Sequence, residues 1–537
     1  MERTPLHVAR LAYLPNVPEV LTRPETVRFS GEGTTGSRGY DERIGYLLPG
    51  SYGRPIAKPT SEGGEVRTET KGGYRVGVLF SGGQAAGGHN VLIGLFRTLK
   101  RFDAKSRLFG FSGGPSGLIE GRYEELHADL PDAYLNQGGF DLIGSGRTKI
   151  ETGRQFADVN KTVTSLALDG LVIIGGDDSN TNAALLAEYF IERDIPVTVA
   201  GVPKTIDGDL RGEYLPLPFG FDTASKTYAE IIGNIGRDAL SADKYTHFIK
   251  LMGRSASHIA LECALMTRPN HTLIGEETVA KGDTMEMIVE KMADLIERRS
   301  ASGKNHGVIL IPEGLIEFIP EMRALIEELN RVEKVEEDIA DTLSSASQHT
   351  FRYLPEEIRN QLLLDRDPHG NVRVSHIRTE ELLSRLLTLE RRKRGGTVPF
   401  LPVHHFLGYE GRAAYPSNFD ATYCYNLGTV AALLIRNELT GYMGTLYDLH
   451  KPTSQWQVAA VPLTSMMTME VRKGKETPVI GKTLVDLKGE PFRLFAEKRT
   501  SWAEEDHYLF PGPIQFAGGS ELTDRGPATL YLQPCVG

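Results

Sequence analysis

The chain has 537 residues, of which 40% are apolar and 24% are charged, as in ordinary soluble globular proteins. Its net charge of −10 disfavours a nucleic-acid-binding protein, because that class usually carries a positive excess. No apolar run approaches the ~18 residues of a membrane-spanning helix, so we expect no membrane association. The three cysteines match no disulfide or metal spacing, which favours a reducing, cytoplasmic location.

Residues 1–72 are rich in proline, glycine, arginine and glutamate and show little periodicity, which predicts an N-terminal extension. From Tyr74 onward, apolar runs such as YRVGVLF and LDGLVIIGG alternate with stretches of helical periodicity. Strands that alternate with helices predict an α/β fold whose parallel sheets are covered on both faces.

The same alternation predicts two α/β domains. We expect the first over residues 73–235 and the second over residues 236–314 and 401–460. Residues 315–400 are highly charged and helical in pattern, which indicates a helical insertion into the second domain. Residues 461–537 contain several turn signals, and we expect them to return to the two domains.

Glycines and charged residues follow several predicted strands, where parallel sheets bind ligands. The stretch SGGQAAGGHN comes after the first strand and opens a helix, so its backbone N–H groups could approach a phosphate. Tight packing explains such glycines equally well. The stretch matches neither the P-loop nor the G-x-G-x-x-G pattern, which weakens both nucleotide-binding interpretations.

Asp177 and Asp178 stand together in GGDDSN, where a strand ends and a helix begins. Adjacent carboxylates repel each other unless a cation or hydrogen-bond donors compensate them. Mg²⁺ held by one carboxylate and by substrate phosphates would fit. The alternative is helix capping, since aspartate is favoured at that position, and each residue could serve one purpose.

The next strand end carries Lys204, Thr205 and Asp207 in PKTIDGD. A fixed cation beside a carboxylate suits phosphoryl transfer to an alcohol, because the carboxylate takes the hydroxyl proton and the cation neutralises the moving group. A polar turn is the alternative, and by itself it explains these residues at least as well.

Weaker signals follow further strands. Arg254 in MGR stands before a predicted helix, which would suit a phosphate. Glu313 in PEG could accept hydrogen bonds from sugar hydroxyls, and GYEGR places Arg412 close to Tyr409. Singly, each of these residues is explained as well by a solvated surface charge.

Taken in order and at these intervals, GGDDSN, PKTIDGD, MGR, PEG and GYEGR resemble the pyrophosphate-dependent 6-phosphofructokinases. VRKGK and PGPIQF are similar to the long form of that family, and the likeness covers about residues 74–520. The resemblance implies two Rossmann-like α/β domains and Mg²⁺ as cofactor. It implies reversible phosphoryl transfer from pyrophosphate to the 1-hydroxyl of fructose 6-phosphate, in glycolysis or gluconeogenesis.

On the matching positions, the resemblance implies a pyrophosphate and metal site in the first domain. Asp177 would bind Mg²⁺, and Asp207 would be the general base, with Lys204 and Asp178 as the other catalytic residues. The residues expected to bind pyrophosphate are Gly82, Gly83, Arg147, Gly176, Ser179 and Lys204.

The resemblance also implies a sugar-phosphate site in the second domain, with Arg254 on the phosphate and Glu313 on the hydroxyls. Lys244 and Tyr245 match a pair that reaches the substrate across a subunit interface, so we expect a homodimer with shared active sites. The residues expected to contact the sugar phosphate are Thr205, Ile206, Asp207, Lys244, Tyr245, Met252, Gly253, Arg254, Glu313, Tyr409, Glu410, Gly411 and Arg412.

The resemblance bears on the phosphoryl donor as well. The ATP-dependent relatives carry glycine where this chain has Asp178 and Lys204. A carboxylate at 178 would repel the α-phosphate of a nucleotide, and a cation at 204 would complement pyrophosphate. An ATP-dependent phosphofructokinase and a non-catalytic regulatory subunit are the alternatives, although the motifs of an active enzyme are all present. A dinucleotide sensor is disfavoured because its fingerprint is absent.

Overall fold

A computed structural model describes residues 3–39, 41–60, 72–331, 342–366, 372–396, 400–472 and 475–533. The chain divides into two compact units. Unit 1 comprises Met1–Ala224, Glu410–Thr483 and Ile514–Gly537, and unit 2 comprises Ser225–Tyr409 and Leu484–Pro513. Parts of the predicted N-terminal extension and of the helical insertion lie outside the described residues, as do Lys473 and Gly474 of VRKGK.

Unit 1 is built on an eight-stranded sheet in the order β14-β13-β8-β7-β3-β4-β5, with β6 paired to β3. The central strands are parallel, whereas β5 and β14 pair antiparallel to β4 and β13. The strands are β3 (Arg75–Ser81), β4 (Arg107–Phe111), β5 (Tyr123–Leu126), β6 (Ser145–Gly146), β7 (Gly170–Gly175), β8 (Thr198–Pro203), β13 (Tyr442–Tyr447) and β14 (Gln457–Pro462).

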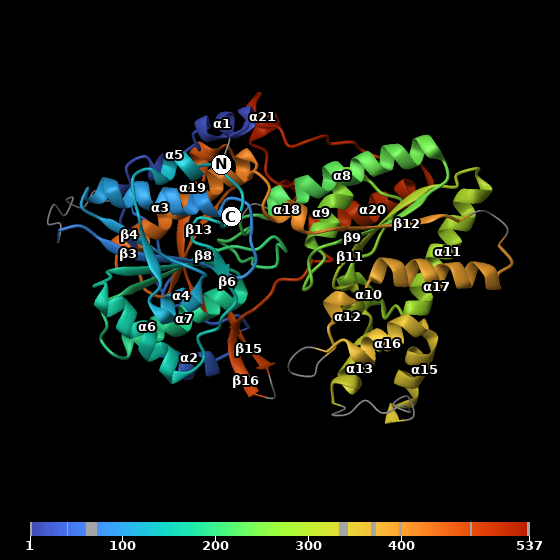
Figure 1. Cartoon of the computed structure of the whole chain (residues 1–537), viewed down its shortest axis with the longest axis horizontal. Coiled ribbons are helices and arrows are strands. Elements are labelled where there is room, and N and C mark those ends of the chain that lie inside the picture. Colours follow the sequence, from blue (N-terminus) through green and yellow to red (C-terminus); the bar gives the residue numbers. More distant parts are fainter. Residues whose placement is uncertain are drawn as a thin grey trace. The chain divides into compact units, whose positions relative to one another are not determined.

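Helices cover both faces of this sheet (Figure 1), which is why β3, β7 and β8 are almost wholly buried. One face carries α3 (Gly88–Phe102) and α19 (Asn418–Arg436). The other carries α4 (Pro115–Glu120), α6 (Gly153–Ser165) and α7 (Asp177–Ile191). A Cβ on Gly94 of α3 would lie 2.0 Å from the Tyr425 carbonyl oxygen of α19, so glycine allows these helices to pack closely.

The described part of residues 3–60 packs on unit 1. It contains α1 (Pro5–Ala12), η1 (Glu19–Leu21), η2 (Pro24–Thr26), β1 (Phe29–Ser30), α2 (Arg43–Leu47) and β2 (Lys58–Pro59). Ala57 forms a bridge with Ala460 of β14, which joins this segment to the edge of the sheet. A hairpin of β15 (Met467–Arg472) and β16 (Lys475–Ile480) packs against α7. Two short helices follow, α21 (Ser520–Thr523) and α22 (Ala528–Tyr531).

Unit 2 contains a parallel four-stranded sheet in the order β10-β11-β9-β12. The strands are β9 (Thr246–Leu251), β10 (His271–Thr272), β11 (Gly307–Pro312) and β12 (Pro402–Leu407). The helices are α8 (Phe221–Ala242), which begins in unit 1, α9 (His258–Thr267), α10 (Gly275–Lys281), α11 (Met285–Ala301), α12 (Leu315–Phe318), α13 (Pro320–Asn330), α15 (Ser345–Tyr353), α16 (Glu356–Leu364), α17 (Thr379–Lys393) and α20 (Glu490–Glu504). Two 3-10 turns complete the described elements of the predicted insertion and of the β13–β14 connection: η3 (Val374–His376) and η4 (Thr453–Gln455).

The α/β architecture predicted from the sequence, with two sheets built mainly of parallel strands, is confirmed. The domain limits differ from the contact-based division, because β12 joins the sheet of unit 2 but β13 and β14 join the sheet of unit 1. The described helices of residues 315–400 bury their apolar side chains in the core of unit 2. Among the described residues, no helix is both long and apolar enough to cross a membrane.

Candidate functional site

The carboxyl ends of β3, β7 and β8 lie side by side, since these strands are parallel neighbours in unit 1. Each end is followed by residues that the sequence singled out: Gly82 after β3, Asp177 after β7 and Lys204 after β8. The sheet therefore brings a glycine loop, a pair of carboxylates and a lysine to one edge, where parallel sheets bind their ligands.

Lys204 is buried, with 6% of its surface exposed, and its Nζ donates a hydrogen bond to the Gly83 carbonyl oxygen at 2.7 Å. A Cβ on Gly82 would lie 3.2 Å from this Nζ, and the φ of +89° at Gly82 also favours glycine. Burial lowers the pKa of Lys204 to about 8, against the opposing effect of the Asp207 carboxylate. A lysine held this way remains a cation at neutral pH and is poised to meet an anion.

Two arginines approach the same glycine loop. A Cβ on Gly83 would lie 2.9 Å from Nη2 of Arg412 and 3.7 Å from Nη2 of Arg147. Both guanidinium groups lower the pKa of Lys204 further, as expected for neighbouring positive charges. Three cations around one glycine loop are suited to a multiply charged anion.

Asp177 and Asp178 form the first turn of α7, and the helix cap is Gly176. Neither side chain is therefore the N-cap, although both stand in the first turn, where a negative charge complements the helix dipole. Arg472 of β15 and Lys149 both pair with Asp178, the lysine Nζ at 3.2 Å. Burial alone would raise the pKa of Asp178, but the hydrogen bond from Arg472 and the charge of Lys149 hold it below its usual value.

Asp177 has a weaker partner, since Nζ of Lys482 lies 3.7 Å from its Oδ2. Cations therefore compensate the two adjacent carboxylates, and Lys149, Arg472 and Lys482 were all missed by the sequence analysis. Arg472 stands within the VRKGK stretch that carried the resemblance, which was the available signal.

Ser179 and Gly176 sit closer to the sheet. The Ser179 hydroxyl is buried and donates to the Ser81 hydroxyl at 2.8 Å, which joins α7 to the end of β3. A Cβ on Gly176 would lie 3.4 Å from the Lys204 carbonyl oxygen, in ordinary contact. Both residues line the strand ends, and the Ser179 hydroxyl donates its hydrogen bond to another residue of the protein.

Asp207 is partly exposed at the same edge, three residues after Lys204. Its backbone N–H donates to the Thr205 hydroxyl at 3.1 Å, which tightens the turn, while Ile206 is buried. Asp209, which the sequence analysis did not select, is also buried. Burial raises its pKa to about 7, and the carboxylates of Asp207 and Asp177 add to the effect.

These carboxylates test the fit of the expected Mg²⁺. No three histidine, cysteine, aspartate or glutamate residues of the described chain form a group that could hold a metal ion by themselves. Asp177 instead offers one carboxylate near the Lys204 cation, and the pKa of Asp209 is raised mainly by burial, with the carboxylates of Asp207 and Asp177 adding to the effect. A cation that takes few protein ligands and several phosphate oxygens fits this donor set.

Unit 2 gathers its predicted residues at an equivalent edge. β11, β9 and β12 are parallel neighbours, and they are followed by Glu313, by Met252–Arg254 and by Tyr409. The Gly253 N–H donates to Oε2 of Glu313 at 3.1 Å, and its φ of +131° favours glycine. This contact fixes the Glu313 carboxylate beside the loop Met252–Arg254.

Arg254 is exposed, and it precedes α9 by four residues rather than standing at the helix start, as the sequence had suggested. It opens on a hollow of about 530 Å³. Gly314 packs under the loop, because a Cβ there would lie 2.0 Å from the Arg254 carbonyl oxygen. The arginine side chain is therefore held at its base and open at its tip.

Lys244 and Tyr245 stand at the other end of β9 from Met252–Arg254. A six-residue strand is about 20 Å long, so unit 2 does not bring this pair to the edge that holds Arg254. The Lys244 side chain is exposed, with its Nζ 4.9 Å from the centre of the Tyr245 ring.

α18 (Tyr409–Arg412) carries the remaining predicted residues. Tyr409 is 70% exposed and Glu410 is exposed, whereas Gly411 is buried. Arg412 is the member of this helix that reaches the glycine loop of unit 1.

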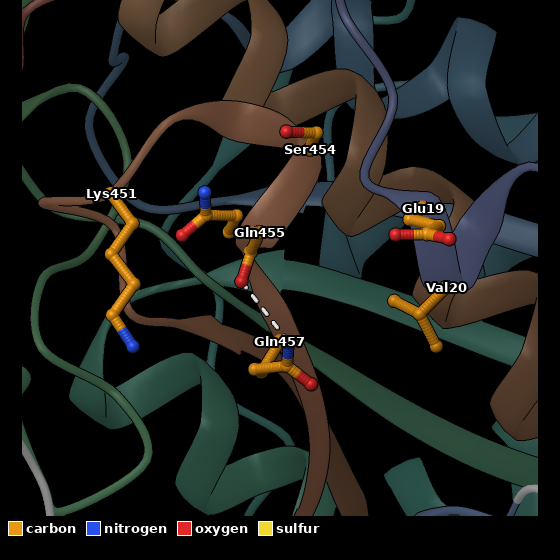
Figure 2. Close-up of a pocket in the computed structure, with 6 residues that line it drawn as sticks. All are labelled: Glu19, Val20, Lys451, Ser454, Gln455 and Gln457. Carbon is orange, nitrogen blue, oxygen red and sulfur yellow. Dashed lines mark hydrogen bonds between the residues drawn. The ribbon is translucent and has the colours of Figure 1, made fainter.

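A hollow of about 490 Å³ lies elsewhere on unit 1 (Figure 2). It contains none of the predicted site residues, and Nζ of its one lysine, Lys451, is bonded to Asp448 at 2.9 Å. The residues that line it are Glu19, Val20, Lys451, Ser454, Gln455 and Gln457. The hollow therefore lacks the convergent charges of the strand-end site.

Cations and carboxylates at the carboxyl edges of two parallel sheets define an α/β protein that binds phosphate-bearing ligands. Residues 75–360 match the family model described as phosphofructokinase, and the chain belongs to that family. This confirms the family resemblance seen in the sequence.

Two of the relatives that match over nearly the whole chain show the degree of identity. The pyrophosphate–fructose 6-phosphate 1-phosphotransferase of Treponema pallidum is 51% identical, covering 98% of this chain and 96% of the relative. The protein of the same name from Entamoeba histolytica is 47% identical, with 99% and 100% covered. The solved pyrophosphate-dependent phosphofructokinase of Nitrosospira multiformis has the same fold, with a TM-score of 0.53 at 16% identity, covering 84% of this chain and 96% of that one.

Proposed function

We propose that the chain transfers a phosphoryl group from pyrophosphate to the 1-hydroxyl of fructose 6-phosphate, giving fructose 1,6-bisphosphate and phosphate, and catalyses the reverse reaction. The names of the relatives from Treponema pallidum and Entamoeba histolytica support this activity. The observation that carries it is the buried Lys204 on the loop that Arg147 and Arg412 also approach, with Asp207 three residues further on.

Asp207 acts as the general base that takes the proton of the sugar hydroxyl, and it returns a proton in the reverse direction. Its partial exposure leaves the carboxylate accessible to substrate. Lys204, Arg147 and Arg412 stabilise the charge on the transferred group, and binding both substrates in line supplies most of the remaining rate enhancement.

Asp177 is the residue that would hold Mg²⁺ together with oxygens of pyrophosphate. When bound, the ion supplies charge neutralisation on the phosphoryl oxygens. Gly82, Gly83 and Gly176 leave room for pyrophosphate near the backbone, and the hydroxyl of Ser179 stabilises the loop by its bond to Ser81.

Asp178 excludes a nucleotide in this proposal. Its carboxylate is fixed by Arg472 and Lys149 rather than free to turn away, so its bulk would block an α-phosphate placed at the same position. Lys204 provides the matching attraction for pyrophosphate.

The sugar phosphate is bound by the strand-end residues of unit 2 in this proposal. Arg254 holds the 6-phosphate and Glu313, fixed by the Gly253 N–H, accepts hydrogen bonds from sugar hydroxyls. Further contacts come from Thr205, Ile206, Met252, Gly253, Tyr409, Glu410, Gly411 and Arg412. The distance of Lys244 and Tyr245 from Arg254 along β9 supports a homodimer in which this pair serves the partner's site. The proposed enzyme acts in the cytoplasm, in the sugar metabolism to which these substrates belong.

An aldolase-coupled assay with fructose 6-phosphate and Mg²⁺ tests the proposal. One reaction receives pyrophosphate and a second receives ATP at the same concentration. We expect turnover with pyrophosphate alone. Turnover with ATP alone would replace the donor assignment by that of an ATP-dependent phosphofructokinase, and inactivity with both would support a regulatory subunit.

A further inference from the structure

Arg10 of α1 is almost fully buried, although it lies in the N-terminal segment that precedes the first α/β motif. Its Nη1 donates to Oδ1 of Asn418 at 2.7 Å and its Nη2 donates to the Pro416 carbonyl oxygen at 2.9 Å. The guanidinium carbon also lies 4.1 Å from the centre of the Phe516 ring. Arg10 therefore grips the start of α19 and the residues just before it.

The gripped segment is the direct continuation of Arg412. Residues 413–417 connect α18 to α19, and they are confined on a second side by Gly138. A Cβ on Gly138 would lie 2.1 Å from the Ala413 carbonyl oxygen and 2.3 Å from that of Ala414. The path of the chain after Arg412 is thus fixed by contacts at both ends of this short connection.

The same turn of the N-terminal segment holds the start of α3. The side-chain nitrogen of Asn136 donates to the carbonyl oxygens of Arg10 and Tyr13, each at 2.7 Å. Asn136 in turn exchanges hydrogen bonds with Asn90, from its backbone N–H at 2.7 Å and to its side-chain oxygen at 2.8 Å. Asn90 lies in the first turn of α3, directly after the glycine loop. Figure 1 shows α1 beside α5 and α19 in this part of unit 1.

Burying a guanidinium group is costly, and burial lowers the pKa of Arg10 to about 10. Its hydrogen bonds to the connection go to neutral oxygens, so no carboxylate there offsets the cost. An apolar side chain of similar length would fill the space without this penalty. The directional bonds to Asn418 and Pro416 are what an apolar side chain could not supply.

We propose that Arg10 is a positioning residue for phosphoryl transfer, which acts by holding Arg412 against Gly83. This proposal rests on the function proposed above. It gives the N-terminal segment a role in the active site, although none of the residues proposed above to contact the substrates belongs to that segment.

The experiment compares Arg10→Met, Arg10→Lys and Arg412→Met with the double variant Arg10→Met/Arg412→Met. Arg10→Met fills the space without hydrogen bonds, and Arg10→Lys keeps the charge with a single donor group. Arg54→Met is the matched control, because Arg54 belongs to the same N-terminal segment and donates to the carbonyl oxygens of Gly50 and Thr440, remote from the connection.

We expect Arg10→Met to lower kcat/KM by about 10- to 100-fold, Arg10→Lys by less, and Arg54→Met by less than about 2-fold. The double variant should be no worse than Arg412→Met alone, because two residues that act through one interaction are not additive. Losses that multiply in the double variant would overturn the proposal, as would a fall in Tm without a fall in kcat/KM.

Amide hydrogen exchange of residues 412–418 gives a readout that is independent of activity. We expect exchange there to rise about 10-fold in Arg10→Met, or in Arg10→Lys if the methionine variant does not fold, and to be unchanged in Arg54→Met. Unchanged exchange would contradict the proposal. An inactive wild-type enzyme with the expected exchange would instead refute the proposed function and leave the mechanical role of Arg10 standing.

Discussion

At the scale of single residues, the site depends on cations that are held close together at the ends of β3 and β8. Lys204 is buried, bonded to the Gly83 carbonyl oxygen and near two guanidinium groups, so its charge is costly until an anion arrives. In the proposed function, bound pyrophosphate would relieve that cost, and Asp207 lies near enough to affect the pKa of the same lysine. The functions proposed for Asp207 and Lys204 can each be tested by substitution.

Replacing Asp207 by serine should lower kcat by about 10²–10⁴-fold while leaving the dissociation constants of both substrates nearly unchanged. The reason is that a general base accepts the proton in the transition state and contributes little to binding of the substrates in the ground state. Steady-state kinetics in both directions, with calorimetric binding of fructose 6-phosphate, measure the split. A parallel loss of binding and turnover would make Asp207 a structural residue.

Lys204 should give the pyrophosphate KM a pH dependence. Its folded pKa of about 8 means that the cation is present below pH 8 and is lost as the pH rises through that value. We expect the KM for pyrophosphate to rise by up to about 10-fold per pH unit above pH 8, and the KM for fructose 6-phosphate to stay level. Pyrophosphate itself also titrates, so Lys204→Met is the reference. If the wild type and this variant show the same pH profile, Lys204 is not the titrating group.

At the scale of elements, the hairpin β15–β16 is joined to α7 through Arg472 and Asp178, across about 300 positions of sequence. The sequence could not predict this ion pair, because local sequence patterns give no information about a partner so distant along the chain. Glycine and charge at the ends of β3, β7 and β8 were visible in the sequence, since neighbouring parallel strands place their carboxyl ends together. The grouping of these strand ends could therefore be predicted, because each glycine or charged residue closely follows its own strand in the sequence.

The pair can be tested with a double-mutant cycle of Arg472→Met and Asp178→Asn. Removing Arg472 takes the main hydrogen-bond donor from the Asp178 carboxylate at the proposed donor site, so we expect the KM for pyrophosphate to rise by about 10-fold. Asp178→Asn should relieve most of that rise, with a coupling of about 1–2 kcal/mol. Arg43→Met is the control, because Arg43 pairs with Glu476 on the exposed side of the same hairpin. Additive effects in the cycle would show that the pair does not bear on the donor site.

At the scale of the whole molecule, the sequence predicted the α/β class and the helical character of the described residues in 315–400. The domain limits were harder to place, because a helix followed by a strand, such as α19 and β13, reads alike in either sheet and only the pairing of β13 with β8 assigns it to unit 1. Lys244 and Tyr245 lie at the opposite end of β9 from Arg254, which supports the proposal that each active site draws on two copies of the chain.

Complementation tests that proposal. Asp207→Ser and Lys244→Ala are each expected to be nearly inactive as pure proteins. After unfolding and refolding as an equal mixture, half of the dimers are mixed and each has one intact site, so activity should recover to about one quarter of wild type. A mixture no more active than its components would show that each chain completes its own site.

Synthesis of pyrophosphate is the most direct test of the central claim, because it requires inorganic phosphate itself to accept the phosphoryl group. The purified chain is incubated with fructose 1,6-bisphosphate, Mg²⁺ and phosphate, and ³¹P NMR follows the products. We predict pyrophosphate and fructose 6-phosphate in equal amounts, at a rate that depends on phosphate and is unaffected by ADP. Formation of ATP with ADP, and no pyrophosphate with phosphate, would contradict the assignment of Lys204 and Asp178 as the residues that select the donor.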